Sequence, residues 1–266
     1  MTGGAEIPKV TLFFITFNQR AIAVATLRDA LSQVYPAERL DIIALDDGSD
    51  DGTFAALRAV ASGHEHRVRL VADTHEANYR SAALWNRCIS MAAPDTDVFV
   101  QVDDVRLRPD FIMQHVKWHR DNAPHVVSGA KFEGPEETWQ LSACRRRSLA
   151  GPGGSARRDV LATAMWGASL SYPRRLMTES CSRPTEQPYD EAMTGYGYHE
   201  VELAYRLQIA GGRTVYDPAA GVFHRDHDPV AEQRRGLDRQ NLVKQGLADN
   251  ANFFCVKHGL DALPQW

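Results

Sequence analysis

The sequence has few cysteines, and none of them are closely spaced. Cys88, Cys144, Cys181 and Cys255 show no CxxC pairing, which fits reduced thiols in a cytosolic protein and excludes a zinc site built from cysteine pairs. The opening stretch MTGGAEIPKV lacks the apolar core of a signal peptide. The longest apolar runs, such as VTLFFITF, are too short to span a membrane. We therefore expect a cytoplasmic protein without a transmembrane segment, which could still work peripherally at a membrane surface.

An excess of positive charge is also missing. The formal net charge is −4, and the densest basic stretches are only CRRRS and SARRD, so we expect no nucleic-acid partner. Hydrophobic residues make up 44% and charged residues 24% of the 266 positions, an ordinary globular composition. Because the chain contains no internal repeat and no low-complexity linker, we expect residues 1–266 to form a single domain.

Two familiar phosphate-binding loops are absent. No GxxxxGK[ST] occurs, and no GxGxxG follows the first apolar run, which disfavours a P-loop enzyme and an NAD-dependent oxidoreductase. The glycine-rich stretch CRRRSLAGPGGSARRD, residues 144–159, instead predicts a flexible surface loop or lid.

Apolar strand-like runs alternate with helical patterns in the first part of the chain. Strands are predicted at 10–18, 40–47, 67–73 and 96–104, and helices at 20–35, 53–62 and 80–92. This alternation is typical of an α/β fold with a mostly parallel sheet flanked by helices. Further along the chain the alternation loosens. There the patterns predict helices at 110–122 and 199–212, strands at 125–134 and 213–224, and a polar C-terminal helix.

Acidic residues follow two of the predicted strands. Asp46–Asp47 and Asp103–Asp104 each end an apolar run, and Asn18 ends the first one. One such pair alone is typical of a solvated turn. Two pairs from separate parallel strands should converge at the carboxyl edge of the sheet, where ligands bind in such folds. Their convergence favours a site for a cation and a ligand.

Five segments, in this order, resemble the family-2 glycosyltransferases of the GT-A fold. They are VTLFFITFNQR, ALSQVYPAERLDIIALDDGSDDGT, RSAALWNRCISMA, VQVDDVRLRPDF and GYHEVELAYRLQIAGG, with YDPAAGVFH as a later match. The resemblance implies a Rossmann-like nucleotide-binding half (1–110) and a smaller, mixed acceptor-binding half with a C-terminal helix (111–266). It also implies an inverting hexosyltransferase that moves a sugar from a nucleotide-diphosphate sugar to an acceptor hydroxyl, assisted by Mn²⁺ or Mg²⁺.

The resemblance also assigns the donor site. The residues implied in binding the donor nucleotide are Ile15, Thr16, Phe17, Asn18, Asp46, Asp47, Arg80 and Asp103. Asp46 would accept a hydrogen bond from a pyrimidine ring N–H, and Phe17 would lie against the base. Arg80 would contact the diphosphate, and Asp103 would bind the ribose. Asp104 and His224 would ligate the metal, although Val102 stands where a strict DXD motif has its outer Asp.

The catalytic base is implied within His199-Glu200-Val201-Glu202. Glu200 takes the position of the family's catalytic acid, and Glu202 is the alternative. Both glutamates could instead simply favour the positive end of a helix. His199 and Trp166 are implied at the sugar or acceptor, although Trp166 fits a packing role as well.

Several alternatives stay open. His227 could replace His224 as metal ligand. Uridine is favoured as the donor base over thymidine and guanosine, and the acceptor could be a sugar, a lipid-linked molecule or a small molecule. A sugar nucleotidyltransferase is disfavoured because TFNQRAI contains no glycine where that class has a glycine-rich loop. A non-catalytic nucleotide- or glycan-binding protein of the same fold is the other alternative.

Overall fold

The computed structural model describes residues 7–74, 80–120, 123–134, 140–141, 158–159, 162, 165, 167–181, 186–224 and 239–263. The predicted glycine-rich loop lies outside these residues except for Arg158 and Asp159 at its end. Trp166 and His227 also lie outside them.

The predicted alternation of the first part is confirmed. The strands β1 (Val10–Thr16), β2 (Leu40–Asp46), β3 (Val68–Ala72) and β4 (Val98–Val102) pair in parallel, in the order β3-β2-β1-β4. They are connected by α1 (Arg20–Leu31), η1 (Ala37–Arg39), α2 (Thr53–Ala61) and α3 (Ser81–Met91). Parallel strands need such crossover connections, and their runs of buried side chains are typical of strands covered on both faces.

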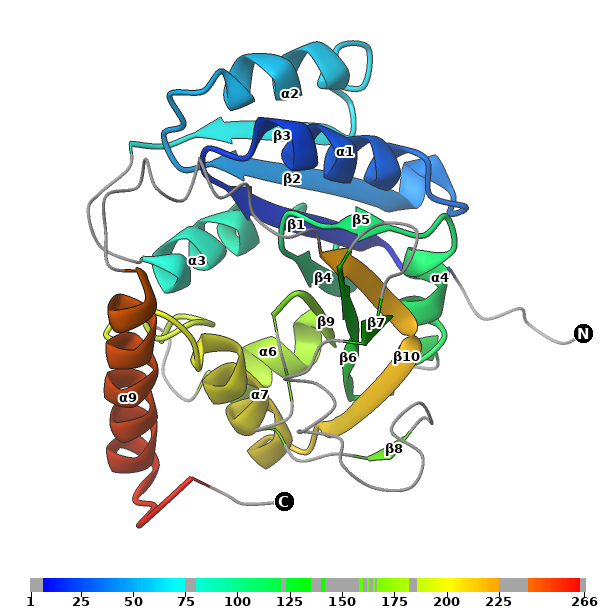
Figure 1. Cartoon of the computed structure of the whole chain (residues 1–266). Helices are drawn as coiled ribbons and strands as arrows, with labels where there is room; N and C mark the ends of the chain where they lie inside the picture. The colour runs from blue at the N-terminus through cyan, green and yellow to red at the C-terminus, as the bar shows by residue number, and fades with distance from the viewer. Residues whose placement is uncertain are drawn as a thin grey trace, which may run out of the picture.

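The later strands extend the same sheet and make it mixed and curled (Figure 1). They are β5 (Arg106–Leu107), β6 (His125–Glu133), β7 (Gln140–Leu141), β8 (Arg158–Asp159), β9 (Ser169–Pro173) and β10 (Arg213–His224). The sheet order continues β4-β9-β6-β10-β5, with β9 antiparallel to both of its neighbours. The remaining helices are α4 (Phe111–Val116), α6 (Arg174–Ser180), α7 (His199–Ile209) and α9 (Arg239–His258). The fold is therefore the α/β class that the sequence predicts.

Two hydrophobic clusters cover the two faces of the sheet. Along β1, Leu12 and Phe14 pack with α1, α2 and α4, whereas Phe13 between them packs with α3, α6 and α7. This alternation follows from the period of two in a strand. The carboxyl edge of the parallel strands therefore rests on a core that is packed on both faces.

Two predicted helices end at least four residues earlier than the pattern indicated. α1 stops at Leu31, and beyond it the Gln33 side chain donates to the backbone carbonyls of Asp29 (3.0 Å) and Arg108 (2.8 Å). α4 ends at Val116, where the chain tightens into turns.

α4 and the turn after it carry two buried histidines that face β9. His115 and His119 bond Ser171 Oγ at 2.8 and 2.7 Å, and burial lowers the pKa of each imidazole to about 3. The histidines therefore join α4 to the sheet as neutral hydrogen-bonding groups.

None of the helices in the described part of the chain is both long enough and apolar enough to cross a membrane. The cytoplasmic location stays a prediction.

Candidate active site

The turns after β1 and β2 are locked together by Asn18. Its backbone N–H donates to Ser49 Oγ (2.8 Å), and its side-chain Oδ1 accepts from the N–H of Asp50 (2.9 Å). Asn18 has φ of 51°, a left-handed conformation that asparagine tolerates better than most residues. The sequence places Asn18 at a strand end, and this bonding explains why an asparagine suits that position.

The Asp46 carboxylate is buried at the end of β2. It accepts hydrogen bonds from the backbone N–H (3.3 Å) and the hydroxyl of Ser49. Burial raises the pKa of Asp46, and these two bonds only partly offset the rise. Thr16 is the register partner of Asp46 on β1, and its buried hydroxyl has no hydrogen-bond partner among the described residues. A buried polar atom of this kind leaves a hydrogen bond to be made by a bound ligand or an ordered water.

Arg80 lies at the same edge of the sheet, at the N-terminus of α3. Its Nη2 is 2.6 Å from Asp47 Oδ1 and 3.6 Å from Asp73 Oδ1, and it donates to the carbonyl of Thr74 (2.5 Å). The guanidinium is therefore held beside the ends of β2 and β3.

The chain just after the second acidic pair is fixed by α1. Thr26 Oγ1 donates to the carbonyl of Val105 (2.7 Å), and Arg106 forms a two-pronged ion pair with Asp29 at 2.6 and 3.1 Å.

Burial raises the pKa of Asp103 to about 6; Lys131 opposes this rise, and the Glu200 carboxylate adds to it. Glu200 therefore lies within electrostatic range of the acidic pair.

β5 and β10 pair the residues that follow Asp104 with those that precede His224. Their antiparallel register pairs Val222 with Leu107 and Phe223 with Arg106. If this register continued by one residue, His224 would lie opposite Val105, the residue after Asp104. The described residues contain no group of three or more His, Cys, Asp or Glu side chains that could hold a metal. Two protein donors fit a Mg²⁺- or Mn²⁺-type ion that takes its other ligands from substrate phosphates and water.

Glu200 lies in the first turn of α7 and is partly buried. Its Oε1 accepts a hydrogen bond from Gln101 Nε2 on β4 (3.2 Å). Gly167 packs directly against its side chain, since a Cβ at position 167 would lie 2.6 Å from Glu200 Cδ. The carboxylate is thus enclosed on two sides and lies close to the end of β4.

Glu202 has a different environment, although it is only two residues away. It is fully buried, and its carboxylate contacts Arg206 Nε (2.8 Å), Lys257 Nζ (2.7 Å) and His258 Nε2 (3.2 Å). Burial alone would raise the pKa of Glu202, but hydrogen bonds from His258, Arg206 and Lys257 lower it well below its usual range. Glu202 therefore joins α7 to α9 as a group that is ionised at neutral pH.

His199 and the loop before α7 lie beside these groups. The His199 ring is buried and bonds the backbone carbonyl of Met193 through Nε2 (3.0 Å).

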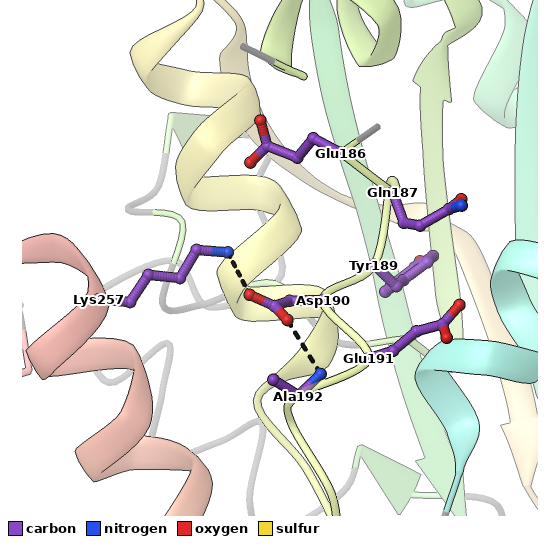
Figure 2. A pocket seen from close by; sticks show the side chains of 7 residues that line it. All are labelled: Glu186, Gln187, Tyr189, Asp190, Glu191, Ala192 and Lys257. Carbon is purple, nitrogen blue, oxygen red and sulfur yellow. Dashed lines mark hydrogen bonds and ion pairs between the residues drawn. The ribbon is translucent and has the colours of Figure 1, made fainter. Parts of the chain in front are cut away.

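A pocket of about 260 Å³ lies between the loop before α7 and α9 (Figure 2). Its lining residues are Glu186, Gln187, Tyr189, Asp190, Glu191, Ala192 and Lys257. Lys257 Nζ is 2.6 Å from Asp190 Oδ2 across its mouth.

Sequence reasoning missed the residues that hold Glu200 and Glu202. Lys257 and His258 lie more than fifty positions after Glu202, and no local pattern indicates that pairing. Gln101 gave a readable signal, because it is the one polar residue in the buried strand VFVQV. A polar side chain inside such a strand must find partners.

The family model described as Glycosyl transferase family 2 matches residues 11–176, which is more than half of the chain. The chain belongs to glycosyl transferase family 2. EpsE of Bacillus subtilis (strain 168), a protein provisionally named as a glycosyltransferase, is 31% identical over 88 residues. That match covers 33% of this chain and 30% of EpsE.

The fold of this family 2 chain is also similar to a solved structure, the mannosyltransferase PcManGT from Pyrobaculum calidifontis in complex with GDP-Man and Mn²⁺. The TM-score is 0.65 at 20% identity, and the match covers 92% of this chain and 64% of the other. At this identity the likeness shows the GT-A fold. The chain thus spans under a third of EpsE and under two thirds of PcManGT.

Proposed function

We propose that this family 2 chain transfers a sugar from a nucleotide-diphosphate sugar to an acceptor hydroxyl with inversion at the anomeric carbon. The observation that carries the proposal is the position of Glu200, whose Oε1 accepts a hydrogen bond from Gln101 Nε2 (3.2 Å) on β4, two residues before Asp103. A general base close to the strand ends at which the donor would bind is the arrangement that such a transfer needs. Residues 1–110 would bind the donor, and residues 111–266 would supply the base and bind the acceptor.

The donor nucleotide is proposed to lie across the ends of β1, β2 and β4. The buried hydroxyl of Thr16, which has no hydrogen-bond partner among the described residues, and the buried carboxylate of Asp46 support a polar ligand there. Asp46 would accept from a ring N–H of the base, with Ile15, Phe17 and Asn18 alongside. Asp103 would accept from the ribose hydroxyls. Uridine remains our proposed base, and the GDP-Man bound to PcManGT makes guanosine the alternative to test.

The diphosphate is proposed to meet positive charge from two sides. Arg80, held beside the strand ends by Asp47, would approach it from α3. Asp104 and His224 would hold Mn²⁺ or Mg²⁺, which when bound would supply the charge that stabilises the departing diphosphate.

Glu200 is proposed as the general base, and Glu202 is not. A base must be able to accept a proton, and the Glu202 carboxylate is already occupied by Arg206, Lys257 and His258. In the step, the acceptor O–H proton passes to Glu200 while the acceptor oxygen bonds to the anomeric carbon. The bond from that carbon to the diphosphate oxygen breaks, and its electron pair leaves with the nucleoside diphosphate. Attack from the face opposite the leaving group inverts the configuration.

Transfer itself can be followed by NMR of the donor's anomeric proton. The chain would be incubated with Mn²⁺, each of a panel of UDP-, dTDP- and GDP-sugars, and simple sugars or water as acceptor. We expect one α-linked donor to be consumed and a β-linked product or β-hemiacetal to appear first, with no reaction in EDTA. A product that keeps the donor's configuration would contradict inversion, and failure of every donor to react or bind would contradict the function.

A further inference from the structure

We propose that Gln101 is a positioning residue for Glu200, held in place by Tyr189 and Asn86. The inference rests on the proposed function, because it assigns a role through the proposed base. Gln101 is fully buried in β4, so its side chain cannot contact a substrate and any effect on transfer must pass through a neighbour.

Both ends of the Gln101 amide are engaged. Nε2 donates to Glu200 Oε1 at 3.2 Å, and Oε1 accepts from the hydroxyl of Tyr189. An ionised carboxylate can only accept hydrogen bonds, so the NH₂ end of the amide must face Glu200. The phenol then donates to the carbonyl end. The two partners therefore fix one orientation of the amide.

Tyr189 is itself fixed by α3. The Asn86 side chain donates to the Tyr189 carbonyl (2.9 Å) and accepts from its backbone N–H (2.8 Å), and both residues are buried. Arg80, which would contact the donor diphosphate, lies at the N-terminus of the same helix. A chain of buried hydrogen bonds thus runs from α3, on the donor side, through Tyr189 and Gln101 to Glu200.

This network determines which Glu200 oxygen is available. Oε1 is occupied by Gln101, and Oε2 has no hydrogen bond to any described residue. Gly167 packs against the same oxygen, since a Cβ at position 167 would lie 2.3 Å from Oε1. In the proposed role, Gln101 fixes the orientation of the Glu200 carboxylate, and Oε2 is the oxygen that would accept the proton of the acceptor hydroxyl. A base must keep such an orientation to act efficiently.

The test is a double-mutant cycle on transfer kinetics with the best donor of the panel. Gln101→Met keeps the shape of the side chain but removes the donor to Glu200. We expect kcat to fall about 10–100-fold, the usual worth of one hydrogen bond to a charged group, with the donor KM within about twofold. Tyr189→Phe, which removes one hydroxyl, should show the same split with a smaller loss. Gln245→Met, at an exposed position on α9, is the matched control and should leave kcat unchanged.

The decisive arm is Gln101→Met in the Glu200→Gln background. If Gln101 acts through Glu200, the second change should lower kcat by no more than about twofold there, because the base that it orients is already gone. Full additivity of the two losses, or a kcat loss matched by an equal rise in donor KM, would show a merely structural role and overturn the inference. If Glu200→Gln lowers kcat and both Gln101→Met and Tyr189→Phe leave it intact, the inference fails alone. If Glu200→Gln has no effect, the proposed base fails, and the inference fails with it.

Discussion

Replacing Glu200 with glutamine is expected to slow sugar transfer by about 10²–10⁴-fold, the usual contribution of a positioned general base. The amide keeps the shape of the side chain and can still bond Gln101, but it cannot take the acceptor's proton. Glu200 is not one of the residues proposed to contact the nucleotide. The affinity for the nucleoside diphosphate should therefore stay nearly unchanged. Release of nucleoside diphosphate at saturating donor measures the rate, and titration calorimetry measures the affinity.

The companion variant is Glu202→Gln, assayed on the fraction of protein that is folded. Its rate of transfer per folded molecule should be near that of the unchanged chain. A large loss of turnover in folded Glu202→Gln, with Glu200→Gln near normal, would move the base to Glu202. If neither variant slows transfer, the acidic start of α7 serves only the helix.

The large effect of Glu202→Gln is expected on stability. The fully buried carboxylate faces Arg206, Lys257 and His258, and its loss leaves buried positive charge without a counter-charge. Breaking a buried ion pair by removing one partner typically costs about 3–5 kcal/mol. Urea unfolding at pH 7.5 should therefore show a fall of that order in the free energy of unfolding. The matched control is Asp190→Asn, which removes a more exposed partner of Lys257 and should cost about 1 kcal/mol or less.

The pH dependence of this loss carries a definite sign. The folded-state pKa of Glu202 lies below its ordinary value of 4.5, so its stabilising effect is present above pH 4.5 and is lost as the pH falls further. The stability difference between the two chains should accordingly shrink in acid. A difference that stays constant from pH 7 down to the acid limit of the folded state would mean that the carboxylate charge is not what stabilises the α7–α9 contact.

The edge of the sheet at which the donor is proposed to bind was predictable, because the sequence patterns that mark it are local. Each of β1, β2 and β4 is a short apolar run that ends in Asn18, Asp46–Asp47 or Asp103–Asp104, and parallel strands separated by helices must put those ends at one edge. The alternation of apolar runs with helical patterns therefore predicted the strands, their parallel direction and the shared edge at which both acidic pairs lie.

The environment of the glutamates was not predictable from local pattern. Glu200 and Glu202 share one helical turn, and sequence alone could rank them only by resemblance. Their difference comes from distant partners: Gln101 lies 99 positions before Glu200, and His258 lies 56 positions after Glu202. The insertion of antiparallel β9 between β4 and β6 is likewise set by long-range pairing, which no short window of sequence encodes.

The central claim is that the edge of the sheet where Asp46–Asp47 and Asp103–Asp104 lie binds a nucleoside diphosphate together with a divalent cation. It is tested most directly by isothermal titration of UDP and GDP into the chain and into Asp104→Ala, each with Mn²⁺ and with EDTA. We predict that the unchanged chain binds one of the two nucleotides at least about tenfold more tightly with Mn²⁺, a difference of about 1.4 kcal/mol, and that Asp104→Ala loses most of this difference. Equal affinity of the unchanged chain in Mn²⁺ and in EDTA, or a Mn²⁺ effect that Asp104→Ala fully retains, would contradict the account.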